Sequence, residues 1–486
     1  MKMLLKFIIL LGVTAMTGCV SVGPDYARPT NDVPATAYKM LSATNELGAW
    51  KEARPLDNVP KGAWWEVFGD PKLNELEGRA RLANQDLRAA VARVEQARAS
   101  ARIVRSELMP TVDGNPSWLR QRYSPNANPS FGEITANTFT VPLDLSYEVD
   151  LWGRVRRSFE SARGDAQASL ASMYNVMLTL QADLARDYFA LRALDAEIAT
   201  VNSTIGLRIE LLTLTRNRFE GGIGNELDVA QAETQLAETQ AELAGLQKRR
   251  AELENAIAIL VGENPSRFQL AALTGPGWNP QPPGVPAGLP ADLLERRPDV
   301  AQAERELASA NARIGVAKAA FFPVVRLTGS GGFVSGDIES LFNWESRVWS
   351  FGPSISLPIF AGGRNLANMN RARSAYEEAV ARYRQQVLVA FGDVENSLSG
   401  LHFLAHQAEA QDRAVASARR AANLATQRYA AGIVSYVEVV VANRGALVAE
   451  RGQAQLTGQR LAASVQLIKA LGGGWDQSEI QVAAGK

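Results

Sequence analysis

The stretch TFTVPLDLSYEVDL, Thr138 to Leu151, alternates apolar and polar side chains almost without a break. Its apolar side chains are Phe139, Val141, Leu143, Leu145, Tyr147, Val149 and Leu151. Between them stand the acids Asp144, Glu148 and Asp150. Successive side chains of a strand point to opposite faces, so this strand would have one apolar and one acidic face. Two kinds of strand fit this pattern: a half-buried antiparallel strand, and a strand between lipid and a watery pore.

The chain contains most of its sequence pattern twice, 210 residues apart. The stretch RFEGGI from Arg218 returns as RYAAGI from Arg428. The apolar face of the quoted strand returns as well, whereas its acidic residues do not. The returning apolar side chains are Trp349, Phe351, Ile355, Leu357 and Ile359. Self-similarity at a fixed period indicates a duplicated unit.

Each unit is predicted to contain a helix, two strands, a very long helix, a tight glycine-containing break and a further helix. In the first unit the expected helices span 73–108, 154–219 and 227–261, and the strands 111–123 and 135–151. In the second unit the expected helices span 298–322, 364–429 and 437–471, and the strands span 324–333 and 347–360. The expected domains are a signal peptide (1–18), an N-terminal segment (19–72), the first repeat (73–273), a linker (274–290), the second repeat (291–471) and a C-terminal tail (472–486).

The lengths of the predicted helices exclude a compact globular domain. A helix over 154–219 would be about 99 Å long at 1.5 Å per residue. The two shorter helices of the first unit, stacked end to end, would run beside the long one. We therefore expect a long cylinder of antiparallel helices with a coiled-coil-like apolar stripe.

The predicted strands are too few to form a membrane-spanning sheet alone. A sheet in lipid must close on itself, because unpaired edges leave backbone groups without partners. Four strands per chain allow barrels of 8, 12 or 16 strands, and an eight-stranded barrel is filled by its own side chains. A conduit therefore requires at least a trimer. Asp144, Glu148 and Asp150 would then line water, with the apolar face from Phe139 to Leu151 towards lipid.

The N-terminus reads as an export signal. Lys2 and Lys6 flank an apolar run over 4–13, too short for a good transmembrane helix. Cys19, the only cysteine, follows in MTGC. It is either a free or buried thiol or, because MTGC looks like a lipobox, a cysteine that carries diacylglycerol and an N-acyl chain such as palmitate. Acylation would anchor the chain without spanning the bilayer, and Val20 is not the aspartate that often marks inner-membrane retention.

Composition and motifs argue against several other functions. With 51 basic and 51 acidic residues, a nucleic-acid or anionic partner gains no electrostatic support. The chain has no HExxH, GxSxG or GxxxxGK[ST] motif, so we predict no enzyme and no cofactor. His402 and His406, with Glu409 nearby, have a spacing that can hold a metal, but solvated helix residues are far commoner, so we predict no metal site.

Four motifs give the chain a family resemblance. They are VGPDYARP (22–29), WWEVFGDPKLNELEGRARLANQDLRAAVARVEQARA (64–99), LSYEVDLWGRVR (145–156) and ERRPDVAQAERELASANARIGVAKAAFFP (295–323). Between about Cys19 and Leu471 the chain resembles the TolC-like outer-membrane factor family. Within it, the resemblance is to the NodT-like lipoprotein branch of RND-type multidrug efflux channels.

The resemblance implies an α+β membrane protein: a homotrimer with a 12-stranded β-barrel in the outer membrane of a Gram-negative bacterium and an α-helical barrel across the periplasm. It also implies a periplasmic adaptor and an inner-membrane pump, of RND type, as partners. The adaptor would dock on the hairpin tips, at Gly221, Gly222, Ile223, Gly432 and Ile433.

The resemblance further implies a gate near the second tip. The gate positions correspond to Tyr429, Val437, Val441 and Arg444. Relatives often carry an aspartate ring where this chain has Val441, so an apolar constriction is expected instead, with Glu438 and Asp228 as nearby acids. For Tyr429 and Arg444 the alternative is ordinary packing between helices.

Three functions remain open from the sequence. The first is the exit duct of a tripartite efflux pump for drugs or other small toxic compounds. The second is the same duct in metal-ion export or type I protein secretion, because the cargo is chosen upstream. The third is a structural coiled-coil lipoprotein without a pore, which explains neither the quoted strand nor its repeat.

Overall fold

The computed structural model describes residues 21–29, 63–124, 126, 134–273, 278, 280–283 and 297–473. These residues divide into two compact units, which we call the sheet unit and the hairpin unit. The sheet unit contains 21–29, 93–124, 126, 134–169 and 302–384. The hairpin unit contains 63–92, 170–273, 278, 280–283, 297–301 and 385–473.

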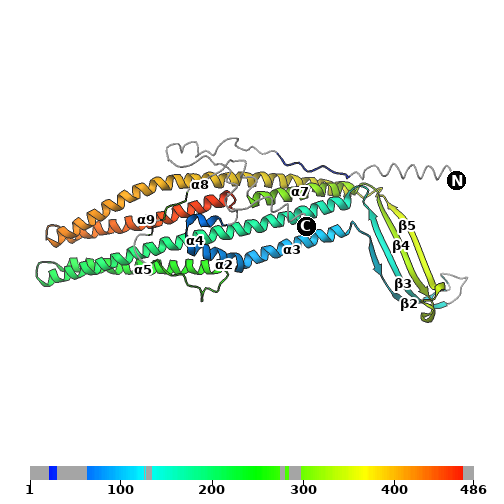
Figure 1. Ribbon diagram of the computed structural model, residues 1–486, viewed down its shortest axis with the longest axis horizontal. Helices are drawn as coiled ribbons and strands as arrows, with labels where there is room; N and C mark the ends of the chain where they lie inside the picture. The colour runs from blue at the N-terminus through cyan, green and yellow to red at the C-terminus, as the bar shows by residue number, and fades with distance from the viewer. Residues whose placement is uncertain are drawn as a thin grey trace. The chain divides into compact units, whose positions relative to one another are not determined.

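Helices make up most of the described chain (Figure 1). In the first repeat they are α2 (Pro71–Ala83), α3 (Gln85–Ser106), α4 (Arg154–Glu220) and α5 (Glu226–Leu260). In the second repeat they are α7 (Pro298–Ala319), α8 (Arg364–Ala430) and α9 (Tyr436–Ala470). Short 3-10 turns are η2 (Trp64–Phe68), η3 (Ile338–Ser340) and η4 (Trp344–Ser346). None of the described helices combines the length and apolar character required to cross a bilayer.

The long helices reproduce the 210-residue repeat. α4 and α8 each contain 67 residues, and α5 and α9 each contain 35. Every one of these helices in the second repeat starts and ends 210 residues after its counterpart. The predicted duplication and its long helices are therefore present in the structure.

The single helix predicted over 73–108 is wrong, because the chain breaks at Asn84. Asn84 has an extended backbone between α2 and α3, and its side-chain oxygen accepts a hydrogen bond from the Leu87 N–H at 2.9 Å. Its amide donates to the Leu260 carbonyl at 3.0 Å. An asparagine that caps the next helix replaces the hydrogen bonds lost at the break, a tertiary contact that helix propensity does not reveal.

The sheet contains β1 (Thr111–Gly114), β2 (Ser117–Tyr123), β3 (Ile134–Val149), β4 (Val324–Ser335) and β5 (Arg347–Ser356), all antiparallel. β1 and β2 both pair with β3, and the register does not shift between them. The interruption faces Pro142, and proline cannot donate to a ladder. The sheet thus has the four predicted strand positions, in the order β1/β2, β3, β4, β5.

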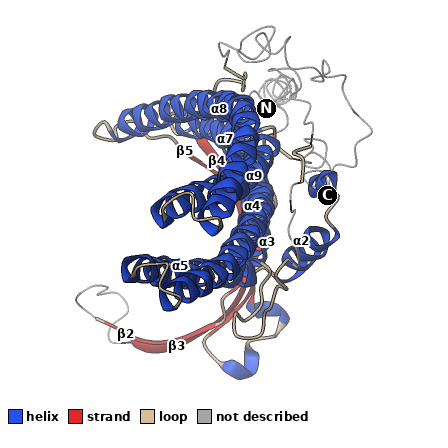
Figure 2. Cartoon of the chain, turned by 90° about the vertical axis from the view of Figure 1, so that its left-hand side faces the viewer, coloured by secondary structure: helices blue, strands red, loops and turns tan. Residues whose placement is uncertain are grey.

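The register gives this sheet one apolar and one polar face. Val141 pairs with Phe333, and Leu145 lies opposite Gly329, which pairs in turn with Phe351. Trp349 is 85% exposed and Phe351 is 70% exposed, although large aromatic side chains are normally covered. Figure 2 shows that β2 and β3, in red, are curved. In the described chain, no further strand pairs with the outer edges of β1/β2 and β5.

Candidate functional site

Both long-helix hairpins turn with the same backbone conformation. Gly222 and Gly432 adopt the left-handed region, with φ of 74° and 75°. In each turn the N–H of the following isoleucine bonds to a carbonyl five residues back, 3.0 Å for Ile223 and 2.9 Å for Ile433. This is the Schellman helix ending, which favours glycine at that position. The predicted tips therefore lie at these turns, and Ile223 and Ile433 are 71% and 63% exposed.

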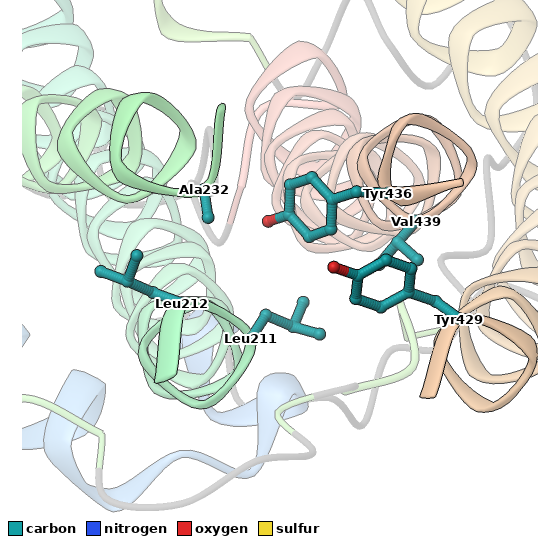
Figure 3. Packing of buried hydrophobic residues seen from close by; sticks show 6 residues of the cluster. All are labelled: Leu211, Leu212, Ala232, Tyr429, Tyr436 and Val439. Atoms are coloured by element: carbon teal, nitrogen blue, oxygen red, sulfur yellow. The ribbon is translucent and has the colours of Figure 1, made fainter. Parts of the chain in front are cut away.

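The side chains behind the second tip form a buried cluster (Figure 3). Its members are Leu211, Leu212, Ala232, Tyr429, Tyr436 and Val439. The rings of Tyr429 and Tyr436 lie 5.3 Å apart between centroids, and both side chains are 3% exposed. Because α4, α5, α8 and α9 all contribute, this cluster joins the two hairpins within one chain.

Arg218, in the last turn of α4, reaches the second hairpin. Its Nη1 donates to the Tyr429 carbonyl at 2.9 Å, and its guanidinium lies 4.9 Å from the centre of the Tyr429 ring. The first contact gives a second donor to a carbonyl at the end of α8 that already accepts the Gly432 N–H at 2.9 Å, and the second is a cation–π interaction. Arg218 thus bonds the two tips directly, a contact that sequence analysis did not predict.

Both tyrosines are neutral at physiological pH. Burial raises the pKa of Tyr436 to about 12. The pKa of Tyr429 is also raised, first by burial and then by the negative charge of Asp228. Their hydroxyl groups therefore remain hydrogen-bond donors, and no charge enters the cluster under ordinary conditions.

The other predicted gate residues stand apart from Tyr429. Val437 and Val441 are 50% and 66% exposed on α9, and Arg444 is exposed one turn further along. Val441 and Arg444 line a hollow of about 700 Å³ beside α8. The structure therefore separates the predicted gate into an internal aromatic contact and an exposed face of α9; their roles stay predictions.

Two of the three predicted pore-lining acids bind arginines at the start of α4. Glu148 accepts hydrogen bonds from Arg154 at 2.7 and 3.1 Å. Asp150 accepts from the backbone N–H of Arg156 at 2.9 Å and from its side chain at 3.2 Å. These are charge-assisted contacts that fix the end of β3 to the helix, so neither carboxylate is free.

Asp144 is placed differently from the other two acids. It lies on the polar face of β3, directly opposite Asp113 of β1 and Ser330 of β4. Like charges at facing positions repel each other, and water between them reduces that cost. Sequence analysis missed Asp113, although it lies in a predicted strand, because the facing partners depend on the register.

The segment before β1 that follows Cys19 docks in the sheet unit. The Val22 N–H donates to the Trp152 carbonyl at 3.0 Å, and the Arg157 guanidinium binds Asp25 at 2.9 Å. Gly23 has φ of +123° and lies so close to Gly315 that an added Cβ would stand 2.6 Å from its Cα. The VGPDYARP motif is the signal for this contact. Cys19 itself lies outside the described residues.

The histidine pair forms a ring contact on α8. The rings of His402 and His406 lie 4.9 Å apart at 78°. Within the part of the chain that the structure describes, no group of three or more His, Cys, Asp or Glu residues is placed to hold a metal ion.

Comparison with known proteins gives concordant matches. The outer membrane efflux protein family matches residues 76–263 and 289–473. The solvent efflux pump outer membrane protein SrpC of Pseudomonas putida is 35% identical over 470 residues, covering 96% of this chain and 97% of the relative. The probable outer membrane lipoprotein SilC of Salmonella typhimurium is 30% identical over 475 residues, covering 97% and 99%.

Solved structures agree with these matches. The outer-membrane channel OprN superposes with a TM-score of 0.85 at 32% identity. The superposition covers 93% of this chain and 99% of that channel chain.

Proposed function

The chain belongs to the outer membrane efflux protein family, and we propose that it is the exit duct of a tripartite pump. It is an outer-membrane efflux channel protein with the fold that its sequence predicted.

The observation that carries the proposal is the two-faced sheet with two unpaired edges. Three copies join edge to edge, so that β5 of one chain pairs with β1/β2 of the next and gives twelve strands. The exposed Trp349 and Phe351 then face lipid, and Asp144 and Asp113 face water. Pairing of these edges satisfies backbone groups that a bilayer would leave without partners.

Cys19 carries the lipid anchor in this proposal. Val22, three residues later, is bonded to Trp152, just after β3. Three residues span at most about 11 Å, so acyl chains on Cys19 enter the membrane close to the end of the sheet. The name of SilC, an outer membrane lipoprotein, supports acylation.

The hairpin tips receive the periplasmic adaptor, which links the duct to an inner-membrane pump of RND type. Ile223 and Ile433 offer exposed apolar side chains at the tips. Opening then requires the hairpins to part, which breaks the contact between Arg218 and Tyr429. The cargo is drugs or other small toxic compounds; SrpC, at 35% identity, is named for solvent efflux.

The test uses a strain that lacks the gene and carries it back in altered forms. We expect deletion to increase susceptibility to hydrophobic drugs and dyes, and the wild-type gene to restore resistance. A double variant, Arg218→Ala with Tyr429→Ala, should in addition admit vancomycin, because the contact that holds the tips together is lost. Phe219→Ala is the matched control, since Phe219 occupies the position of Tyr429 in the first repeat but is 45% exposed.

Two outcomes count against the proposal. Unchanged susceptibility after deletion would remove its support for drug efflux. Vancomycin entry through the Phe219→Ala protein, equal to that of the double variant, would show that any damage to the tips opens the duct and that the Arg218 contact has no special role.

A further inference from the structure

The outward face of α9 carries a continuous stripe that is apolar except for one cation. Its members are Val437, Val441, Arg444 and Val448, which we call the α9 stripe. Steps of three and four residues put all four on one side of the helix. The three valines are 50%, 66% and 62% exposed. The opposite side of α9 is buried, with Val439 at 0%, so the stripe points away from its own chain's core.

The first repeat has no such stripe. The equivalent positions of α5, 210 residues earlier, are Leu227, Gln231, Thr234 and Glu238. Three of these four are polar, and the one charge is negative. Since the two helices have equal lengths and equal turns, the difference lies in the side chains and not in the backbone.

The charge of Arg444 is not compensated by a close acid. Among the described residues, no carboxylate lies within ion-pair distance of its guanidinium, whereas Arg451 binds Glu197 and Glu242. Arg208 of α4 lies near enough for Arg444 to oppose its charge: the pKa of Arg208 is lowered mainly by burial, with Arg444 as a further cause. Glu238 and Glu242 act on Arg208 in the opposite sense. The α9 stripe itself is cationic.

The stripe also borders open space. Val441, Arg444 and Val448, together with Gln411 and Gly452, line the hollow of about 700 Å³ beside α8. A solute in this hollow would contact valine methyl groups and one guanidinium of the stripe, which contains no carboxylate.

We propose that the α9 stripe lines the narrow part of the duct and makes it select against hydrated inorganic cations in favour of anionic and amphiphilic organic solutes. This rests on the proposed function, because three copies must surround one path for the stripes to face each other. Valine side chains from three copies would surround the path, and such an apolar constriction disfavours the hydration shell that small ions retain. Apolar constrictions of this kind close by dewetting. The three guanidinium groups attract anions to the same place.

The test is the reversal potential of the purified trimer in a planar bilayer under a KCl gradient. We expect the wild type to prefer chloride to potassium. Val441→Asp adds one carboxylate per chain to the stripe and should shift the permeability ratio towards potassium on the order of tenfold. Arg444→Gln should shift it in the same direction by less, because it removes a cation without adding an acid. The acidic residues of the sheet are the same in the wild type and in these variants, so they do not contribute to the difference between their permeability ratios.

Thr234→Asp is the matched control. Thr234 is exposed on α5 at the position equivalent to Arg444, so the variant adds the same acid outside the stripe and should leave the permeability ratio near that of the wild type. An equal shift from Thr234→Asp and Val441→Asp would overturn the inference, because selectivity would then follow total charge and not the stripe. The inference would also be overturned if the wild type preferred potassium and Val441→Asp left that preference unaltered. The proposed function as an exit duct would not be affected by that result. If no protein conducts, including the Arg218→Ala and Tyr429→Ala double variant, the proposed function fails instead.

The size of the Val441→Asp protein in detergent shows whether it still assembles as a trimer. If the stripe packs between copies, the aspartate should dissociate the trimer, and that loss of size in detergent would contradict the inference. Val441→Cys provides an independent test, because Cys19, the only native cysteine, has no free thiol once it is acylated. We expect an anionic methanethiosulfonate to react with it on the order of tenfold faster than a cationic one, and Arg444→Gln to abolish that preference. Equal rates in the presence of Arg444 would overturn the inference.

Discussion

The two hairpin tips have the same backbone and different contents. Both turns place glycine at φ near 75° and end their long helices with the same hydrogen bonds. Yet Tyr429 and Tyr436 are 3% exposed, whereas Phe219, at the position of Tyr429, is 45% exposed and Glu226, at that of Tyr436, is exposed as well. The residues that determine the turn are kept in both repeats, and the side chains that meet other elements have diverged.

The largest difference in stability between the two tips should come from truncating the aromatic side chain in the last turn of each long helix. Tyr429→Ala empties a buried site and should cost about 3–5 kcal/mol of local stability. Phe219→Ala removes an exposed ring and should cost about 0.5 kcal/mol. Native-state amide exchange, read separately over the two tips, measures both. Equal losses would mean that burial of Tyr429 does not hold the second tip together.

The next largest difference should appear at high pH. The pKa of Tyr436 is raised from 10.0 to about 12, so its contribution is complete below pH 10 and is lost as pH rises from 10 towards 12. At about 1.4 kcal/mol per pKa unit, the second tip should lose about 2–3 kcal/mol by pH 12. Tyr436→Phe should reduce this dependence, and the part that remains should come from Tyr429, whose pKa is raised as well. The first tip, which has Glu226 there, serves as the internal control; if it loosened in parallel, general alkaline unfolding would be the cause.

Removing the contact between the tips should have a smaller effect. Arg218→Ala deletes the hydrogen bond to the Tyr429 carbonyl and the cation–π contact, and should cost the second tip about 1–2 kcal/mol. Arg428→Ala, its counterpart, alters an exposed side chain and should change stability by no more than about 0.5 kcal/mol. The same exchange experiment applies. A larger effect from Arg428 would reverse the assignment of the bridging residue.

The smallest difference concerns the helix caps. The Asn225 side chain accepts a hydrogen bond from the Asp228 N–H at 3.0 Å, whereas Ser435 makes no side-chain cap bond. Asn225→Ala should therefore destabilise the start of α5 by about 1 kcal/mol, and Ser435→Ala should leave α9 nearly unchanged. Exchange rates of the first-turn amides distinguish the two, and slower exchange at α5 in the alanine variant would contradict the capping argument.

Periodicity was sufficient to predict the large elements. The long helices and strands were located to within a few residues, because a repeat at a fixed distance tests each element twice. The family, fold class and outer-membrane location that the motifs implied are confirmed by the matches along the chain. The break at Asn84 was missed because it depends on a contact with Leu260, 176 residues away.

The candidate site was harder to predict, because it depends on which side chains meet. A strand pattern shows that Asp144 and Glu148 share a face, but not that Glu148 binds Arg154 or that Asp113 faces Asp144. In the sequence, Arg218 and Phe219 simply repeat as Arg428 and Tyr429. Only tertiary structure distinguishes it from Arg428, which lies exposed at the equivalent place.

The unpaired edges of the sheet have a consequence for the life of the protein before assembly. A newly exported copy presents two open strand edges beside uncovered tryptophan and phenylalanine side chains. Such surfaces join indiscriminately with other chains. If three copies assemble as proposed, the interval between export and their meeting is therefore the stage at which aggregation competes most strongly with folding. A mutation that slows this meeting should lower the yield of the protein even where the finished trimer is unaltered.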